Sequence, residues 1–142
     1  MPPDFVITQT DDTDRAYTEI WKPLLAFNQQ IVGNAEGVGF ALLITPQGSD
    51  DISGGLWGLS LWGSFYIGLT FVPEALRGTG VGSGLMQRAE NEAISRNCQT
   101  MWVDTYEFQA REFYERHGFA VFGQIDGPAP MFPRYFMKKT LP

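Results

Sequence analysis

The sequence offers little cysteine or histidine chemistry: Cys98 is its only cysteine and His117 its only histidine among 142 residues. A single cysteine cannot form an internal disulfide, which fits a reducing compartment, and without a cluster of histidine and cysteine we expect no metal. No apolar run approaches the ~20 residues of a membrane-spanning helix, and the N-terminus lacks the basic and apolar regions of a signal peptide. We therefore expect a cytoplasmic protein that binds neither metal nor membrane.

Positive charge is scarce in the first half of the chain. Residues 1–70 carry eight acidic side chains and two basic ones, residues 71–142 carry eight of each, and the net charge is −6. Affinity for nucleic acid depends on lysine and arginine contacts to phosphate, so we expect no nucleic-acid partner. An acidic surface suits a cationic partner, or it only keeps the protein soluble. The length predicts a single domain over residues 1–142.

Hydrophobic periodicity predicts both strands and helices. The predicted strands are residues 5–8, 37–45, 52–62, 65–72, 100–106, 119–122 and 134–141. The predicted helices are residues 12–32, a segment that follows a glycine-rich loop and ends near Asn97, and 109–117. Thr10 or Asp11 would cap the first helix, and Pro23 predicts a kink or a break in it. The order of elements predicts an α/β sandwich around a mixed sheet, with an antiparallel meander between residues 37 and 72.

Glycine is concentrated at residues 77–84, which read Arg-Gly-Thr-Gly-Val-Gly-Ser-Gly between a predicted strand and a predicted helix. Glycines let backbone N–H groups approach a ligand, and a helix N-terminus adds partial positive charge, so the pattern predicts a phosphate site. A Walker loop does not fit, because no lysine occurs between Lys22 and Lys138. A dinucleotide loop does not fit either, because residues 73–76 separate the strand from the glycines and the third glycine position holds another residue.

A third interpretation uses the arginine that opens the loop. The motif Arg77-x-x-Gly80-x-Gly82, with Ala110-x-x-Phe113-Tyr114-Glu115-x-x-Gly118-Phe119 downstream, resembles the two signatures of the GNAT superfamily of N-acyltransferases. The order of elements is similar over nearly the whole chain. The resemblance implies a GNAT-like α/β fold: a central mixed, mostly antiparallel twisted sheet of six to seven strands flanked by helices, with a splayed strand pair that holds CoA. It also implies an N-acetyltransferase that moves the acetyl group of acetyl-CoA to a primary amine of a small-molecule or peptidic acceptor.

The resemblance places the acyl donor on the glycine loop and on the strand before it. Loop N–H groups would hold the pyrophosphate, and the strand edge would pair with the pantetheine amides. The arginine would contact a phosphate or brace the loop. The cofactor-binding residues implied in this way are Thr70, Phe71, Val72, Arg77, Gly78, Thr79, Gly80, Val81, Gly82, Ser83 and Gly84.

Two residues are candidates for catalysis. Tyr114, in the second signature, occupies the position where the family commonly places the acid that protonates the CoA thiolate, although a tyrosine there also suits packing on the sheet. Some members carry a glutamate base on the strand before the loop, and here that position is Tyr66. Asp104, toward the end of the next strand, is the candidate base acting through water; its alternative role is to cap a turn, and a water chain could also deprotonate the amine.

The resemblance does not identify the acceptor. The acidic N-terminal half favours a cationic amine, and the composition leaves a homodimer through the last strand or the helix faces open. The missing strand glutamate also leaves open an acyl-CoA-binding sensor or interaction module without catalysis.

Overall fold

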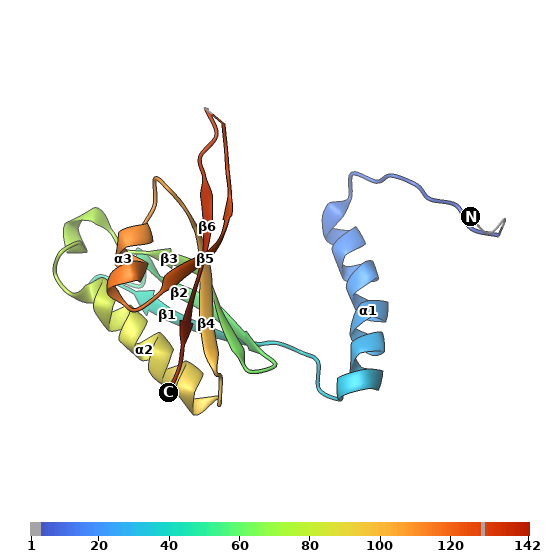
Figure 1. Ribbon diagram of the computed structural model, residues 1–142, viewed down its shortest axis with the longest axis horizontal. Coiled ribbons are helices and arrows are strands. Elements are labelled where there is room, and N and C mark those ends of the chain that lie inside the picture. Colours follow the sequence, from blue (N-terminus) through green and yellow to red (C-terminus); the bar gives the residue numbers. More distant parts are fainter. Residues whose placement is uncertain (1–3, 129) are drawn as a thin grey trace. The chain divides into compact units, whose positions relative to one another are not determined.

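The computed structural model describes residues 4–128 and 130–142. The chain divides into two compact units, one that ends at Glu36 and one that runs from Gly37 to Pro142. The first unit contains a single helix, and the second contains the whole sheet and the remaining helices, which Figure 1 labels along the chain.

Helix α1 spans Thr13–Val32 and is capped by the residue before it. The Asp12 carboxylate accepts a hydrogen bond from the Arg15 N–H at 3.3 Å, which satisfies one of the free donors of the first turn. The predicted cap at Thr10 or Asp11 is therefore wrong by one or two residues. The Thr10 hydroxyl instead accepts a hydrogen bond from the Asp12 N–H at 3.1 Å and shapes the turn that leads into the helix.

Two further expectations for the N-terminal unit are corrected. The predicted break at Pro23 is wrong, because the helix continues through this residue. One proline removes a single N–H donor while the turns on both sides keep theirs. The alternative, a kink at Pro23, stays a prediction. Residues 5–8 are not a strand. Their β-favouring side chains suit a strand, but a strand forms only where another strand pairs with it, and among the described residues none pairs with this segment.

The second unit is built on a six-stranded sheet in the order β1-β2-β3-β4-β6-β5. Neighbouring strands are antiparallel except for β3 and β4, which run parallel, so the predicted mixed, mostly antiparallel sheet and its meander are confirmed. The strands are β1 Val38–Ile44, β2 Gly54–Leu61, β3 Ser64–Phe71, β4 Thr100–Tyr106, β5 Ala120–Ile125 and β6 Arg134–Thr140.

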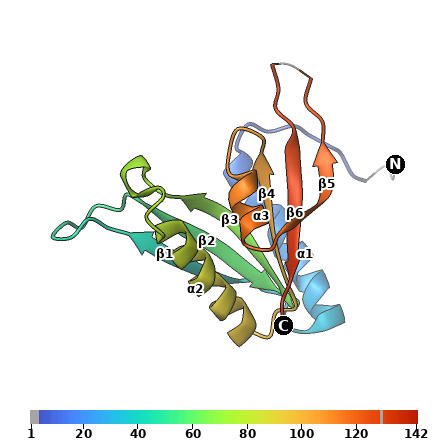
Figure 2. The ribbon, with the colours of Figure 1, turned by 60° about the vertical axis from the view of Figure 1, so that its left-hand side comes forward.

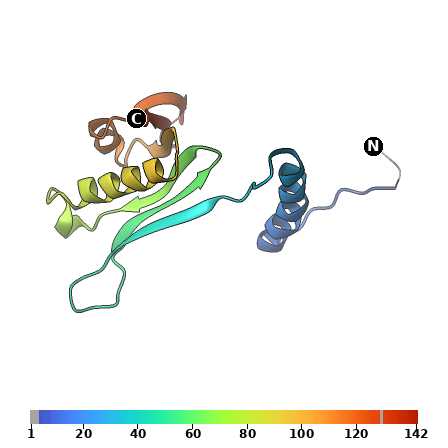
Figure 3. The same cartoon turned by 90° about the horizontal axis from the view of Figure 1, so that it is seen from below.

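Helix α2 (Val81–Ser95) lies along one face of strands β1 to β3, as Figures 2 and 3 show. Its apolar side chains recur every three or four residues and are buried on that face. Asn97 has a φ of 61° and ends the helix region where the sequence predicted. The core that results combines helix and strand residues: Leu85, Met86, Ala89 and Ala93 with Leu42, Leu56, Phe65 and Ile67.

The parallel pair β3–β4 comes apart halfway along. Its register covers only Ser64–Thr100 to Ile67–Val103, and beyond it the two strands no longer pair. Gly68 follows the last paired residue and has no partner in β2 either, because the register shifts there. A bulge of this kind twists and bends a strand, so β3 leaves β4 and opens a gap in the sheet.

Candidate active site

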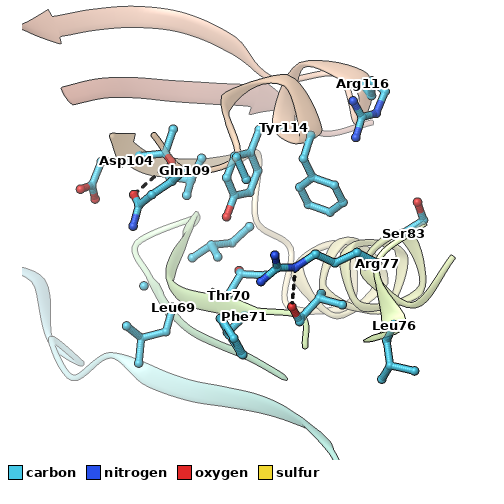
Figure 4. A pocket seen from close by; sticks show the side chains of 18 of the residues that line it. Leu69, Thr70, Phe71, Leu76, Arg77, Ser83, Asp104, Gln109, Tyr114 and Arg116 are labelled. Carbon is cyan, nitrogen blue, oxygen red and sulfur yellow. Dashed lines mark hydrogen bonds between the residues drawn. The ribbon is translucent and has the colours of Figure 1, made fainter. Parts of the chain in front are cut away.

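A cavity of about 780 Å³ lies between the separated ends of β3 and β4 (Figure 4). One wall comes from β3, the glycine loop and the start of α2, and the other comes from β4 and from the short helix α3 (Arg111–Arg116) with the loop before it. The cavity collects residues from both signatures of the sequence. Those that the sequence predicted are Thr70, Phe71, Val72, Arg77, Gly78, Gly80, Gly82, Ser83, Asp104 and Tyr114.

The glycine loop presents backbone rather than side chains to this cavity. Gly78 and Gly80 have φ values of 75° and 92°, a left-handed conformation that other residues adopt only with strain. A Cβ at Gly82 would approach the Phe113 ring to 3.1 Å, a tight contact that would require the ring to shift. No side chain caps the helix that begins at Val81, which leaves its first N–H groups for an anion.

Arg77 braces the loop. Its Nε–H donates to the Val72 carbonyl at 3.0 Å, and its guanidinium lies 5.8 Å from the centre of the Phe71 ring. The hydrogen bond ties the loop back to the end of β3 across a short 3₁₀ turn, Glu74–Leu76. Of the two roles left open by the sequence, the brace is the one that the contacts support.

Three predicted cofactor residues lie outside the cavity lining: Thr79, Val81 and Gly84. The Thr79 hydroxyl donates to the Leu76 carbonyl within the loop. The Gly84 N–H bonds to the Gly80 carbonyl at 2.9 Å as part of the helix, so it is not free to meet a phosphate.

Tyr114 reaches the cavity from α3 with a ring that is 5% exposed. Figure 4 shows its hydroxyl pointing into the gap, toward β3. Burial raises the pKa of Tyr114, and the neighbouring Thr70 hydroxyl opposes that shift. The phenol therefore stays protonated at neutral pH and is available as a proton donor. The Thr70 Oγ1 is itself buried and makes no hydrogen bond among the described residues.

Asp104 enters the cavity from β4 and is held by two partners. Its Oδ1 accepts a hydrogen bond from the Tyr66 hydroxyl at 3.1 Å, and its Oδ2 accepts one from the Arg134 Nε–H at 2.7 Å. The Tyr66 ring stacks on Trp102 with centroids 4.2 Å apart. Burial, and then the hydrogen bond to Asp104, raise the pKa of Tyr66, so this phenol also remains a donor.

Sequence reasoning missed the cavity role of Gln109, which it assigned only to a helix start. The Gln109 Oε1 accepts hydrogen bonds from the Tyr106 N–H at 2.9 Å and from the Thr105 hydroxyl at 3.3 Å. Because its oxygen is occupied by the loop, its Nε2 is the group that can donate toward a ligand. The signal in the sequence was an amide side chain one residue before the second signature.

The other reactive side chains have no catalytic setting. Cys98 is buried, and burial raises the pKa of its thiol, which disfavours a nucleophilic thiolate. His117 lies 3.2 Å from the Ser83 hydroxyl at the rim of the glycine loop. Among the described residues no group of acidic, histidine or cysteine side chains is arranged to hold a metal ion. In the same part of the chain no helix is both long and apolar enough to cross a membrane.

The sequence model of the acetyltransferase (GNAT) family matches residues 6–119. The chain belongs to this family. The predicted GNAT-like fold and the predicted acetyltransferase enzyme are therefore confirmed.

Individual relatives agree with the family assignment. The chain is 38% identical to the acetyltransferase Atu2258 of Agrobacterium fabrum over 125 residues, which cover 87% of this chain and 88% of the relative. It is 34% identical to the blasticidin-S acetyltransferase of Streptomyces morookaense over 92 residues, 64% of this chain and 68% of the relative. The crystal structure of an acetyltransferase from Agrobacterium tumefaciens is 31% identical in sequence and superposes with a TM-score of 0.85. The superposition covers 97% of this chain and 99% of that chain.

Proposed function

We propose that the protein is an acetyl-CoA-dependent N-acetyltransferase that acts on a primary amine of a small-molecule or peptidic acceptor. The observation that carries the proposal is the cavity between β3 and β4, because it joins an anion-binding loop to a buried phenol and a carboxylate. A site that only binds CoA needs the loop and the unpaired edge of β3, but it needs no acid and base. Two ionisable groups at the far end of the same cavity suit a reaction that moves protons.

The donor is held mainly by backbone. The free N–H groups at the start of α2 and in the glycine loop suit the pyrophosphate. Residues 68–71 of β3 have lost β4 as a partner, so their N–H and C=O groups on that side suit the amides of the pantetheine arm. Acetyl-CoA supplies an acetyl group that is activated as a thioester.

In the proposed reaction, two side chains donate and accept the protons that acetyl transfer requires. A carbon–nitrogen bond forms to the acceptor amine, the carbon–sulfur bond breaks, and Tyr114 gives its proton to the leaving sulfur. Asp104 accepts the proton that the amine loses, through one water molecule, and a backbone N–H near Val72 stabilises the charge on the carbonyl oxygen. Tyr114 then recovers its proton from solvent, so the enzyme ends as it began.

Charge and one relative support the choice of acceptor class. The acidic N-terminal half favours a cationic amine. The relative named blasticidin-S acetyltransferase supports small antibiotic amines as the first compounds to test.

The test is release of CoA thiol from acetyl-CoA against a panel of amines, antibiotics and short peptides. We expect at least one acceptor to be turned over, and we expect Tyr114→Phe to lower the turnover about 100-fold. Calorimetry with CoA distinguishes the alternative of a binding module. Tight CoA binding without turnover of any acceptor would overturn the catalytic proposal, and no CoA binding would overturn the donor as well.

A further inference from the structure

The hydrogen bonds of Asp104 join three neighbouring strands at the edge of the cavity. Tyr66 comes from β3, Asp104 from β4 and Arg134 from β6, and the three side chains form one connected group. We call this group the Tyr66–Asp104–Arg134 trio. Only Asp104 of the three lines the cavity, so the other two act on a ligand through it.

The sheet register explains why the trio forms. Tyr66 is opposite Trp102 in the parallel pair, and the two rings stack on the same face of the sheet. Asp104 follows two residues later on the same face of β4, just where the strands stop pairing. Its carboxylate can therefore face the cavity and still reach back to the Tyr66 hydroxyl.

Arg134 is fixed from the other side. It is paired with Tyr106 in the antiparallel register, and its guanidinium lies 5.6 Å from the centre of the Tyr106 ring and 5.1 Å from that of Phe136. Aromatic faces attract a guanidinium and restrict its motion. The Asp104 side chain is 12% exposed and that of Arg134 is 37% exposed, so the pair is sheltered on the carboxylate side.

The trio leaves the carboxylate able to accept more. A carboxylate offers about four acceptor positions. The Tyr66 hydroxyl takes one on Oδ1, and Arg134 contacts Oδ2 through both Nε and Nη2, so the remaining capacity is mainly on Oδ1. A side chain that served only to tie strands together would not need to line a cavity. A carboxylate that is held from two sides and is open on the third suits a ligand with several N–H donors.

We infer that the trio is the recognition site for the acceptor amine, in which Asp104 binds the protonated amine and Tyr66 and Arg134 are positioning residues. The inference rests on the proposed function and specifies the substrate class: a primary amine that is cationic at neutral pH. An ammonium group donates three hydrogen bonds and carries the charge that Asp104 complements. The trio also explains why β3 carries tyrosine at position 66, since the carboxylate comes from the neighbouring strand.

The first experiment measures binding and needs no turnover. CoA-saturated protein is titrated calorimetrically with n-hexylamine, which is cationic, and with n-hexanol, its neutral counterpart. We expect the wild type to bind the amine about tenfold more tightly than the alcohol, the value of one charge-assisted hydrogen bond. We expect Asp104→Asn, which keeps the shape and loses the charge, to bind the two equally. A wild type that binds them equally, or an Asp104→Asn variant that keeps the preference, overturns the inference.

The second experiment asks whether Tyr66 positions Asp104 for the amine or only stabilises the fold. It measures steady-state kinetics with the best acceptor of the amine panel. Tyr66→Phe deletes the hydroxyl that bonds to Asp104 and keeps the stack on Trp102, and we expect the KM for the amine to rise about tenfold while the KM for acetyl-CoA stays constant. Tyr106→Phe deletes a hydroxyl on the same face of β4, two residues past Asp104, and is the matched control, expected to change neither KM.

Which quantity changes, the melting temperature or the KM for the amine, identifies the role of the trio. If Tyr66→Phe lowers the melting temperature and leaves the KM for the amine unchanged, the trio is a structural brace and the inference fails. Arg134→Lys keeps the charge and is expected to raise the KM for the amine less than Arg134→Met does. If no amine is turned over, the proposed function fails, and the n-hexylamine titration still decides the role of the trio.

Discussion

Replacing Gly80 and Gly84 by alanine, one at a time, tests the glycine loop with two variants of the same chemistry. Gly80 precedes the first residue of α2, has a φ of 92° and lines the cavity. Gly84 lies four residues later inside the helix, and a Cβ there would meet nothing within 4 Å. The two substitutions add the same methyl group to the same loop and helix, but they should act in opposite directions.

The magnitudes follow from backbone conformation. Alanine in the left-handed region costs about 1–2 kcal/mol, so Gly80→Ala should lower the melting temperature by about 3–6 °C for a chain of this length. Alanine inside a helix is about 0.5–1 kcal/mol more stable than glycine, so Gly84→Ala should raise the melting temperature by about 2–3 °C. If Gly80→Ala relaxes its strain by rotating the peptide, the N–H groups at the start of α2 leave the cavity.

The assay is calorimetric CoA binding beside thermal unfolding. We expect Gly80→Ala to weaken CoA binding about tenfold, which corresponds to one hydrogen bond to a charged group. We expect Gly84→Ala to bind CoA as the wild type does, because its N–H is already bonded to the Gly80 carbonyl. Wild-type CoA affinity in both variants would refute the assignment of the pyrophosphate to this loop. Equal loss in both would show that the loop needs flexibility rather than a particular φ.

Three further predictions concern single side chains. Tyr114→Phe should lower kcat about 100-fold while CoA binding stays constant, and a parallel loss of CoA affinity would make the tyrosine a packing residue. Arg77→Lys should weaken CoA binding as much as Arg77→Met, because a lysine lacks the Nε–H that bonds to the Val72 carbonyl; rescue by lysine would instead indicate a direct phosphate contact. Burial and nearby cationic side chains lower the pKa of His117 below 6.5. The folded state therefore binds fewer protons than the unfolded state, and stability should fall as the pH drops below 6.5. Urea unfolding at about pH 7.5 and about pH 5.5 checks this, and His117→Gln should lose part of that dependence.

Local patterns predicted most of the elements because their causes are local. The bounds of β4 and the end of α2 near Asn97 follow from apolar periodicity and from one residue that tolerates a left-handed conformation. Residues 5–8 have the composition of a strand, but the prediction of a strand there was wrong. Strand formation depends on a pairing partner, which a segment's own sequence does not determine. The single domain and the homodimer remain predictions.

The candidate site shows the same division between local and non-local information. The glycine loop and Tyr114 lie in signatures of fixed spacing, so they could be found residue by residue. The partners of Asp104 could not be found in that way, because Tyr66 and Arg134 are 38 and 30 residues away in the chain. Their meeting depends on which strands are neighbours and on the register between them, and neither is determined by spacing along the chain.

The bulge at the unpaired Gly68 decides which face of β3 carries Thr70, near Tyr114, and which carries Tyr66, near Asp104. Side chains alternate between the faces of a strand, and one extra residue reverses the alternation beyond it. Ile67 faces the core beneath α2, and without the bulge Thr70 would face away from it. With the bulge Thr70 lies opposite the buried Leu56 and faces Tyr114, while Tyr66 remains on the other face with Asp104. Strand β3 thus places Thr70 beside the proposed acid and Tyr66 beside the proposed amine site, on opposite faces. The gap that the same bulge opens is where a thioester can lie between them.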